Sequence, residues 1–246
     1  MKYMGSKNRI AKEILAIILR DRKDDQWYVE PFVGGANVID KVDGLRLGAD
    51  NNKYLIALYK GLQEGLSFKT EITKELYSLA RNQYNTNLGT FSDFEIGYVG
   101  YMGSANGRFY EGGYSGKSNT KIGTVRDYIA ESINGINKQI PSLLGVKFEC
   151  CDYQSLNIPD NSIIYCDPPY ANTKTYATSR DFDSDLFWEW CRDKAKQGYT
   201  IFISEYQAPE DFTCVWQKEV KSSISANSVT GGSVKTVERL FTYADA

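Results

Sequence analysis

The four residues Asp167-Pro168-Pro169-Tyr170 combine a carboxylate, two prolines and an aromatic ring directly after a strand-like run. The preceding run, Ile163–Tyr165, favours a half-buried strand. A proline has no backbone N–H to donate to a neighbouring strand, so the strand must end near Asp167. The result is a stiff corner that carries one carboxylate, backbone carbonyls held by fixed proline dihedrals, and an aromatic ring just beyond. The alternative is an ordinary loop that contains two prolines.

Two further strand ends carry residues that suit a nucleotide cofactor. The segment YVEPFVGGANV, Tyr28–Val38, runs from a strand into a turn where Gly34 and Gly35 allow a ligand to approach the backbone. Asp50 ends the next strand about 20 residues later, where an acid can accept hydrogen bonds from ribose hydroxyls. The glycine pattern is not G-x-G-x-x-G, which disfavours a nicotinamide site, and a simple tight turn is the alternative. Asp50 could equally be the N-cap of a helix.

These three strand ends meet only if their strands lie side by side in one sheet. Strand-like runs alternate with helical patterns, which is typical of a mostly parallel sheet with helices on both faces. We expect strands near Trp27–Glu30, Leu45–Asp50, Val146–Asp152, Ser162–Asp167, Tyr199–Glu205, Cys214–Val220 and Glu238–Tyr243, and helices near Ser6–Arg20, Asn51–Glu64, Val125–Ile140 and Ser184–Gln197. The last two strands predict an antiparallel hairpin. Ligands of such sheets bind outside the carboxyl ends of the strands.

The middle of the chain interrupts this alternation. From about Leu66 to Thr124, helix-like sequence is followed by a long stretch rich in Gly, Tyr, Ser and Asn, and such segments in compact folds are usually functional or disordered. The whole chain has a net charge of -2, whereas the stretch Ile96–Arg126 has four cations and one anion. Five aromatic residues lie among these charges: Tyr98, Tyr101, Phe109, Tyr110 and Tyr114. We therefore expect an insertion that carries a binding surface.

Composition excludes several other classes of protein. The chain has no histidine, so Ser-His-Asp and Cys-His catalysis are excluded. Its five cysteines form no C-x-x-C pair, which argues against a zinc site and a disulfide framework and favours reduced thiols in the cytoplasm. No apolar run is long enough to cross a membrane, and Glu13 interrupts the apolar patch near the start, which argues against a signal peptide.

Five stretches together resemble the DNA adenine-N6 methyltransferases of the Dam type, the α-class with a DPPY motif. They are KYMGSK at Lys2–Lys7, EPFVGG, GADNN, YCDPPY and SSISANSVTGG at Ser222–Gly232. The resemblance implies a Rossmann-like, S-adenosylmethionine-dependent methyltransferase fold with a mostly parallel seven-stranded sheet and an inserted DNA-recognition domain. It implies a catalytic domain of residues 1–64 and 125–246 and a target-recognition insert of residues 65–124.

The resemblance also implies roles for individual residues. S-adenosylmethionine would be bound by Tyr3, Lys7, Phe32, Gly34, Asp50, Asp152, Tyr153 and Asp167, with Lys7 at the cofactor's carboxylate. The catalytic residues would be Asp167, Pro168 and Tyr170. The resemblance is loose in the insert, so the candidates for binding duplex DNA there come from its basic, aromatic stretch: Arg108, Lys117, Lys121 and Arg126. A solvated basic loop is the alternative. Ser223, in the Ser222–Gly232 loop, is the further candidate for binding DNA. Among these, Arg108 is suited to a guanine base and the other three cations to phosphates.

The function implied is transfer of a methyl group from S-adenosylmethionine to the N6 amino group of a flipped-out adenine in a specific duplex DNA sequence, without a metal. Asp167 and the Pro168 carbonyl would accept the amino hydrogens, and the base would stack on Tyr170. Two alternatives stay open: a methyltransferase acting on RNA adenine or protein glutamine, and a catalytically idle nucleic-acid-binding module of the same fold. The sequence makes no prediction of oligomeric state.

Overall fold

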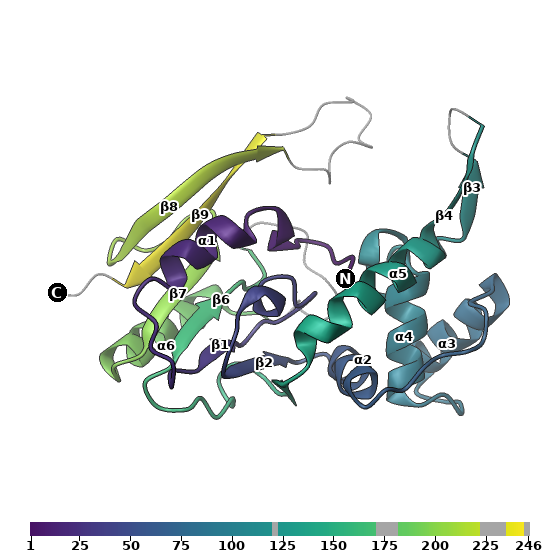
Figure 1. Ribbon diagram of the computed structural model, residues 1–246, viewed down its shortest axis with the longest axis horizontal. Helices are drawn as coiled ribbons and strands as arrows, with labels where there is room; N and C mark the ends of the chain where they lie inside the picture. Colours follow the sequence, from purple (N-terminus) through teal and green to yellow (C-terminus); the bar gives the residue numbers. More distant parts are fainter. Residues whose placement is uncertain (120–122, 171–181, 222–234, 244–246) are drawn as a thin grey trace.

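The computed structural model describes residues 1–119, 123–170, 182–221 and 235–243. Its main sheet has seven strands in the order β5-β2-β1-β6-β7-β9-β8 (Figure 1). The strands are β1 Tyr28–Glu30, β2 Arg46–Asp50, β5 Val146–Cys150, β6 Ile163–Cys166, β7 Thr200–Glu205, β8 Phe212–Lys221 and β9 Lys235–Tyr243. Neighbours from β5 to β7 are parallel, and β9 is antiparallel to both β7 and β8. The predicted mostly parallel seven-stranded sheet and its closing hairpin are therefore confirmed.

Alternating side chains of the central strands build a core on each face of the sheet. Tyr28 and Tyr165 belong to one core, and Val29 and Ile164 belong to the other. The first core is covered by helices α1 (Ala11–Ile18), α2 (Lys53–Gln63) and α5 (Tyr128–Leu143). The second is covered by α6 (Ser184–Lys196), through residues such as Phe187. Helices on both faces give the layered arrangement that the alternating sequence pattern predicts.

Local capping explains where several elements differ from the sequence prediction. Asn52, not Asp50, is the N-cap of α2, because its side chain accepts the N–H groups of Tyr54 and Leu55. The helix expected from Val125 begins at Tyr128 instead, since Asp127 is its N-cap. The glycine turn is followed by a 3-10 turn, η2 (Ile39–Lys41).

The middle segment begins with helices, as its helix-like sequence predicts, but the expectation that its aromatic residues form a surface is wrong for several of them. Two helices, α3 (Lys74–Thr86) and α4 (Asp93–Gly103), occupy its first part, and a 3-10 turn, η3 (Ala105–Gly107), follows. Tyr98, Tyr101 and Tyr110 are buried and share the core of α1, α2 and α5. The aromatic residues spaced through this stretch therefore serve packing, which burial of large apolar rings favours.

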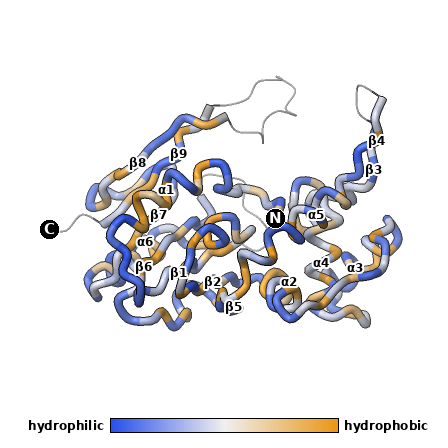
Figure 2. Tube along the Cα trace, in the orientation of Figure 1, coloured by the Kyte–Doolittle hydropathy of each residue, from blue (hydrophilic) through white to orange (hydrophobic). Residues whose placement is uncertain are grey.

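A small exposed hairpin lies at the end of the middle segment and runs into the residues that follow it. It consists of β3 (Lys117–Asn119) and β4 (Val125–Asp127), paired antiparallel. Figure 1 shows that it stands out from the body of the protein beside the start of α5. Figure 2 shows largely hydrophilic colouring along it, and almost all of its residues are exposed.

Candidate active site

The DPPY corner lies directly after β6, as the sequence predicts. β6 ends at Cys166, and 23% of the Asp167 side-chain surface is exposed. The Lys7 ammonium lies 3.0 Å from Asp167 Oδ1 and 3.6 Å from Glu238 Oε2, and the Lys7 side chain is only 7% exposed. Lys7 is held there because it begins a 3-10 turn, η1 (Lys7–Arg9), for which Ser6 is the N-cap. The amino-terminal segment and strand β9 thus each bring a charged group to the corner.

Tyr170 covers one side of this ion pair. Its hydroxyl donates to Glu238 Oε2 at 3.0 Å, and its ring meets the Tyr206 ring edge-on at 4.7 Å between centroids. Lys7 Nζ lies 4.4 Å from the Tyr170 ring centroid, in a cation–π contact. Sequence reasoning missed Glu238 and Tyr206. In the sequence, Glu238 is marked only as an acidic residue in a strand-like run. Because 68 residues separate it from Tyr170, the sequence gives no indication that the two side chains meet.

The charges in this corner shift each other's pKa. Burial raises the pKa of Asp167 above its ordinary value, and Lys7 opposes that rise. Burial would lower the pKa of Lys7, but Asp167 and Glu238 outweigh it and the net shift is upward. Burial also raises the pKa of Glu30 well above its ordinary value, although the Tyr28 hydroxyl donates to it at 2.8 Å. Lys7 therefore stays charged at neutral pH and favours ionised Asp167.

The glycine turn after β1 receives the Tyr3 ring. Gly34 has a φ of +44°, and a Cβ there would lie 2.9 Å from Tyr3 Cε1. A Cβ at Gly35 would lie 2.5 Å from Tyr3 Cβ. The Gly34 carbonyl accepts the Tyr59 hydroxyl at 2.6 Å, and the Gly34 N–H donates to Asp50 Oδ2 at 3.2 Å. The sequence predicted this space for a ligand, whereas in the structure glycine is required so that Tyr3 can approach.

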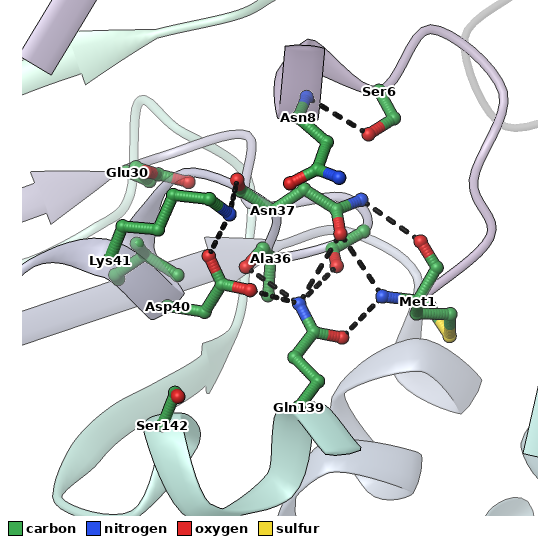
Figure 3. A network of polar contacts seen from close by, with 12 residues as sticks. Met1, Ser6, Asn8, Glu30, Ala36, Asn37, Asp40, Lys41, Gln139 and Ser142 are labelled. Carbon is green, nitrogen blue, oxygen red and sulfur yellow. Dashed lines mark hydrogen bonds and ion pairs between the residues drawn. The ribbon is translucent and has the colours of Figure 1, made fainter. Parts of the chain in front are cut away.

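A buried polar network holds the same turn in place (Figure 3). Gln139 of α5 is 6% exposed and donates to the Ala36 carbonyl at 2.9 Å and to Asp40 Oδ2 at 2.8 Å. Asn37 donates to the Met1 carbonyl at 3.1 Å. Because these groups are buried, the bonds fix the backbone of the turn. Sequence reasoning missed Gln139, whose signal is a polar residue on the buried face of a helical pattern.

A pocket lies between the glycine-turn side of the sheet and the middle segment. Its lining consists of Tyr3, Met4, Asp50, Asn52, Tyr84, Tyr101, Gly107, Arg108, Phe109 and Glu111. The Asp50 carboxylate also accepts the Asn52 N–H at 2.9 Å, and burial raises the pKa of Asp50 to about 6. Arg108 Nε is buried without a hydrogen-bond partner. The pocket thus offers an anion, a cation and the faces of several aromatic rings.

The structure does not bring all the predicted residues to this pocket. Phe32 and Tyr153 pack against each other at 5.2 Å between ring centroids, in the core under α6. Asp152 is exposed and accepts the Gln154 N–H at 2.9 Å in a turn. Lys117 and Arg126 lie on the hairpin. Lys121 and Ser223 lie outside the described residues.

The residues of the pocket and corner fit S-adenosylmethionine. Asp50 supplies an acceptor for ribose hydroxyls, and Tyr3 and Tyr101 supply apolar and aromatic surface. The buried Nε of Arg108 lacks an acceptor that a ligand can provide. Among the described residues, no group of histidine, cysteine or acidic side chains could hold a metal ion. No helix in the described ranges is long and apolar enough to cross a membrane.

A doubly wound sheet with a glycine turn, an acid and a proline corner at the ends of neighbouring strands defines a Rossmann-like, nucleotide-binding α/β protein. The chain belongs to the D12 class N6 adenine-specific DNA methyltransferase family, whose model matches residues 3–130 and 113–211. These ranges include the amino-terminal motif, the glycine turn, Asp50 and the DPPY corner.

The other comparisons add little to this assignment. No curated protein matches the chain significantly. A solved structure of SMU.472 in complex with SAH resembles it with a TM-score of 0.36 and 14% identity, and the match covers 98% of this chain. The chain spans about half of that protein, 53% of its length.

Proposed function

We propose that this protein transfers a methyl group from S-adenosylmethionine to the N6 amino group of an adenine in duplex DNA, as a Dam-type enzyme of the α-class. The observation that carries the proposal is the ion pair between buried Lys7 and partly exposed Asp167, at the DPPY corner of a chain that belongs to an adenine-specific family. Single-molecule sequencing of DNA from cells that express the protein tests it. We expect modified adenine at one short sequence, and unmodified DNA would contradict the proposal.

The corner is suited to activate a weak nucleophile. The lone pair of the adenine amino group is delocalised into the ring, so methyl transfer requires it to be localised. Asp167 and the Pro168 carbonyl would each accept one amino hydrogen, which favours a tetrahedral nitrogen. Pro168 is rigid, so its carbonyl need not reorganise during the reaction. S-adenosylmethionine would supply an electrophilic methyl group on a sulfonium centre: its C–S bond breaks as the C–N bond forms, S-adenosylhomocysteine leaves with the electron pair, and the methylated nitrogen loses one proton to solvent.

Lys7 is proposed to prepare Asp167 for this role rather than to contact the cofactor's carboxylate. Its ammonium bonds one Asp167 oxygen at 3.0 Å and fixes the direction of the carboxylate. The remaining exposure of Asp167 leaves room for a substrate amino group. Tyr170 stays the proposed stacking surface for a flipped base, and its contacts with Lys7 and Tyr206 hold its ring in place.

Cofactor affinity should depend on pH through Asp50. The pKa of Asp50 is raised from 3.8 to about 6, so the carboxyl is mostly protonated in the folded protein at pH 5. If only ionised Asp50 accepts the ribose hydroxyls, the affinity for S-adenosylmethionine should be about tenfold weaker at pH 5 than at pH 7.5. Calorimetry at both values measures this. Asp50→Asn should bind S-adenosylmethionine more weakly than the wild type at pH 7.5, and its affinity should no longer change between pH 5 and pH 7.5. The same tenfold change in that variant would show that another group causes the pH dependence.

The same shift affects stability in a definite direction. Because the folded pKa of Asp50 lies above the unfolded value of 3.8, its contribution favours folding at low pH. That contribution is lost as the pH rises through about 6. Asp50 is thus a carboxylate whose ionisation costs stability, which is common for groups that serve a ligand.

We propose residues 65–124 as the target-recognition insert. We propose that DNA is contacted by the β3–β4 hairpin, whose first strand lies in the insert and whose second strand, β4, follows it at Val125–Asp127. The hairpin is exposed and carries Lys117. Lys117 Nζ lies 3.7 Å from Asp127 Oδ2, a contact that water and phosphate can replace at the surface. Arg126 makes a bidentate pair with Glu131, at 2.5 and 2.9 Å. Arg126 is therefore less available to phosphate than Lys117. Lys121 and Ser223 remain proposed DNA contacts.

Lys117→Ala should weaken binding to all duplexes to a similar degree. Loss of one phosphate contact should reduce the slope of log K against log salt by about 1 unit, without change in sequence preference. Titrations of matched duplexes at several salt concentrations measure both effects. Lys194→Ala, in the last turn of α6, is the control and should change neither. If the slope of log K against log salt is unchanged in Lys117→Ala, Lys117 does not contact DNA.

A further inference from the structure

Arg108 is the cation that lines the pocket beside Asp50, within the described part of the chain. We infer that Arg108 binds the carboxylate of the methionine moiety of S-adenosylmethionine. The inference rests on the proposed function, because it names a residue for the cofactor of that reaction. It differs from the sequence prediction, which assigned Lys7 to this carboxylate and Arg108 to a guanine base.

The position of Arg108 is fixed by the backbone around it. Its N–H donates to the Ala105 carbonyl at 3.2 Å, and its carbonyl accepts the N–H groups of Glu111 and Gly112 at 3.0 and 2.9 Å. Gly107 lies against the amino-terminal segment, since a Cβ there would be 2.3 Å from the Lys2 carbonyl oxygen. The backbone of Arg108 is therefore held in a rigid turn, which reduces the ordering that is needed when its side chain binds a ligand.

The residue after Arg108 anchors the turn from the other side. The Phe109 ring lies 4.7 Å from the Tyr101 ring and 5.8 Å from the Tyr54 ring, both stacked. A Cβ at Gly100 of α4 would lie 2.3 Å from the Phe109 ring. Phe109 is thus locked against two helices, and Arg108 has little freedom to swing out toward a DNA groove on the hairpin side.

Charge distribution assigns the carboxylate to Arg108 rather than to Lys7. The Lys7 ammonium already has two carboxylates, Asp167 and Glu238, within 3.6 Å. Arg108 Nε, in contrast, is buried and has no hydrogen-bond partner. A buried N–H without an acceptor is unfavourable, and a ligand carboxylate would satisfy it. A guanidinium is also the side chain best matched to a carboxylate, through two parallel hydrogen bonds.

The other groups of the pocket fit the rest of the ligand. Asp50 offers an acceptor for hydroxyls, and Glu111 lines the same pocket as Arg108. An amino acid moiety carries both a carboxylate and an ammonium group, so a lining with both charge signs suits it. The stacked rings of Tyr3 and Tyr101, 6.1 Å apart, add the aromatic surface that a sulfonium cation prefers.

Calorimetric titration of S-adenosylmethionine and of its decarboxylated analogue separates the carboxylate from the rest of the cofactor. The wild-type protein should bind the analogue more weakly. Arg108→Met should lose about 10- to 100-fold in affinity for S-adenosylmethionine, as expected for a charged hydrogen bond, and change little toward the analogue. Arg108→Lys should recover part of the loss. Arg81→Met, on the exposed surface of α3, is the matched control and should bind both ligands like the wild type.

The outcomes distinguish this inference from the proposed function. Absence of S-adenosylmethionine binding by the wild-type protein would overturn both. Equal affinity of the wild type for the two ligands, which needs no variant to measure, would overturn the inference alone. The inference would also be overturned if Arg108→Met bound S-adenosylmethionine with unchanged affinity and lost its preference at one base pair of DNA. That result would support the contact between Arg108 and a base.

Discussion

Asp167→Asn should reduce the rate of methyl transfer by about 100- to 1,000-fold, the effect expected when one preorganised electrostatic contact to a transition state is lost. An asparagine has nearly the shape of the aspartate, but its amide presents a donor where the amino group of the substrate needs an acceptor. Lys7 would keep Glu238 as a partner, so the corner should stay folded. Single-turnover kinetics with saturating cofactor measure the chemical step.

The control for this variant is the same substitution at Asp160, an exposed residue in the loop before β6. Asp160→Asn should retain the wild-type rate. Thermal unfolding of both variants should show native folds, so that a lost rate in Asp167→Asn reports chemistry. A rate within about threefold of the wild type would contradict the role of the carboxylate, since the contact is expected to contribute at least 100-fold.

Lys7→Met should both destabilise the protein and shift its pH–rate profile. The substitution leaves Asp167 and Glu238 near one another without the buried cation, and breaking such a pair costs about 3–5 kcal/mol. Lys7 lowers the pKa of Asp167, so its removal should raise that pKa further. The rate should then decline at a higher pH than in the wild type as the solution is acidified.

Denaturant unfolding and the pH dependence of single-turnover rates measure these two effects of Lys7→Met. Lys12→Met, at an exposed position of α1, removes the same charge outside the corner and should change neither. A pH profile that coincides with that of the wild type would show that Lys7 does not control the ionisation of Asp167. Loss of stability alone would then leave Lys7 with a structural role.

The architecture could be predicted from the sequence because its signals are local. The run Ile163–Tyr165 followed by two prolines specifies both a strand and its end, and the structure places β6 there. Periodicity also located α2 and α6 to within two residues at each end. The last strand pair followed from the absence of a helical pattern between them. Each of these features depends on residues that are adjacent in the chain.

The site could be predicted only in part, because contacts between distant segments leave no local signal. Glu238 pairs with Lys7 across most of the length of the chain, and Gln139 holds the glycine turn from 103 residues away. Arg108 looked like a DNA contact because its neighbours are aromatic and the stretch is basic. Three of those rings, Tyr98, Tyr101 and Tyr110, are buried, and Arg108 lines the Asp50 pocket.

Transfer of labelled methyl groups by the purified protein tests the central proposal most directly. The protein is incubated with methyl-labelled S-adenosylmethionine in three separate reactions that contain duplex DNA, RNA or protein. The products are digested and identified by mass spectrometry. We predict label in DNA as N6-methyladenine, and a loss of about 100-fold or more with Asp167→Asn. Label confined to RNA or to protein glutamine, or S-adenosylmethionine binding without transfer to any DNA, would contradict the account.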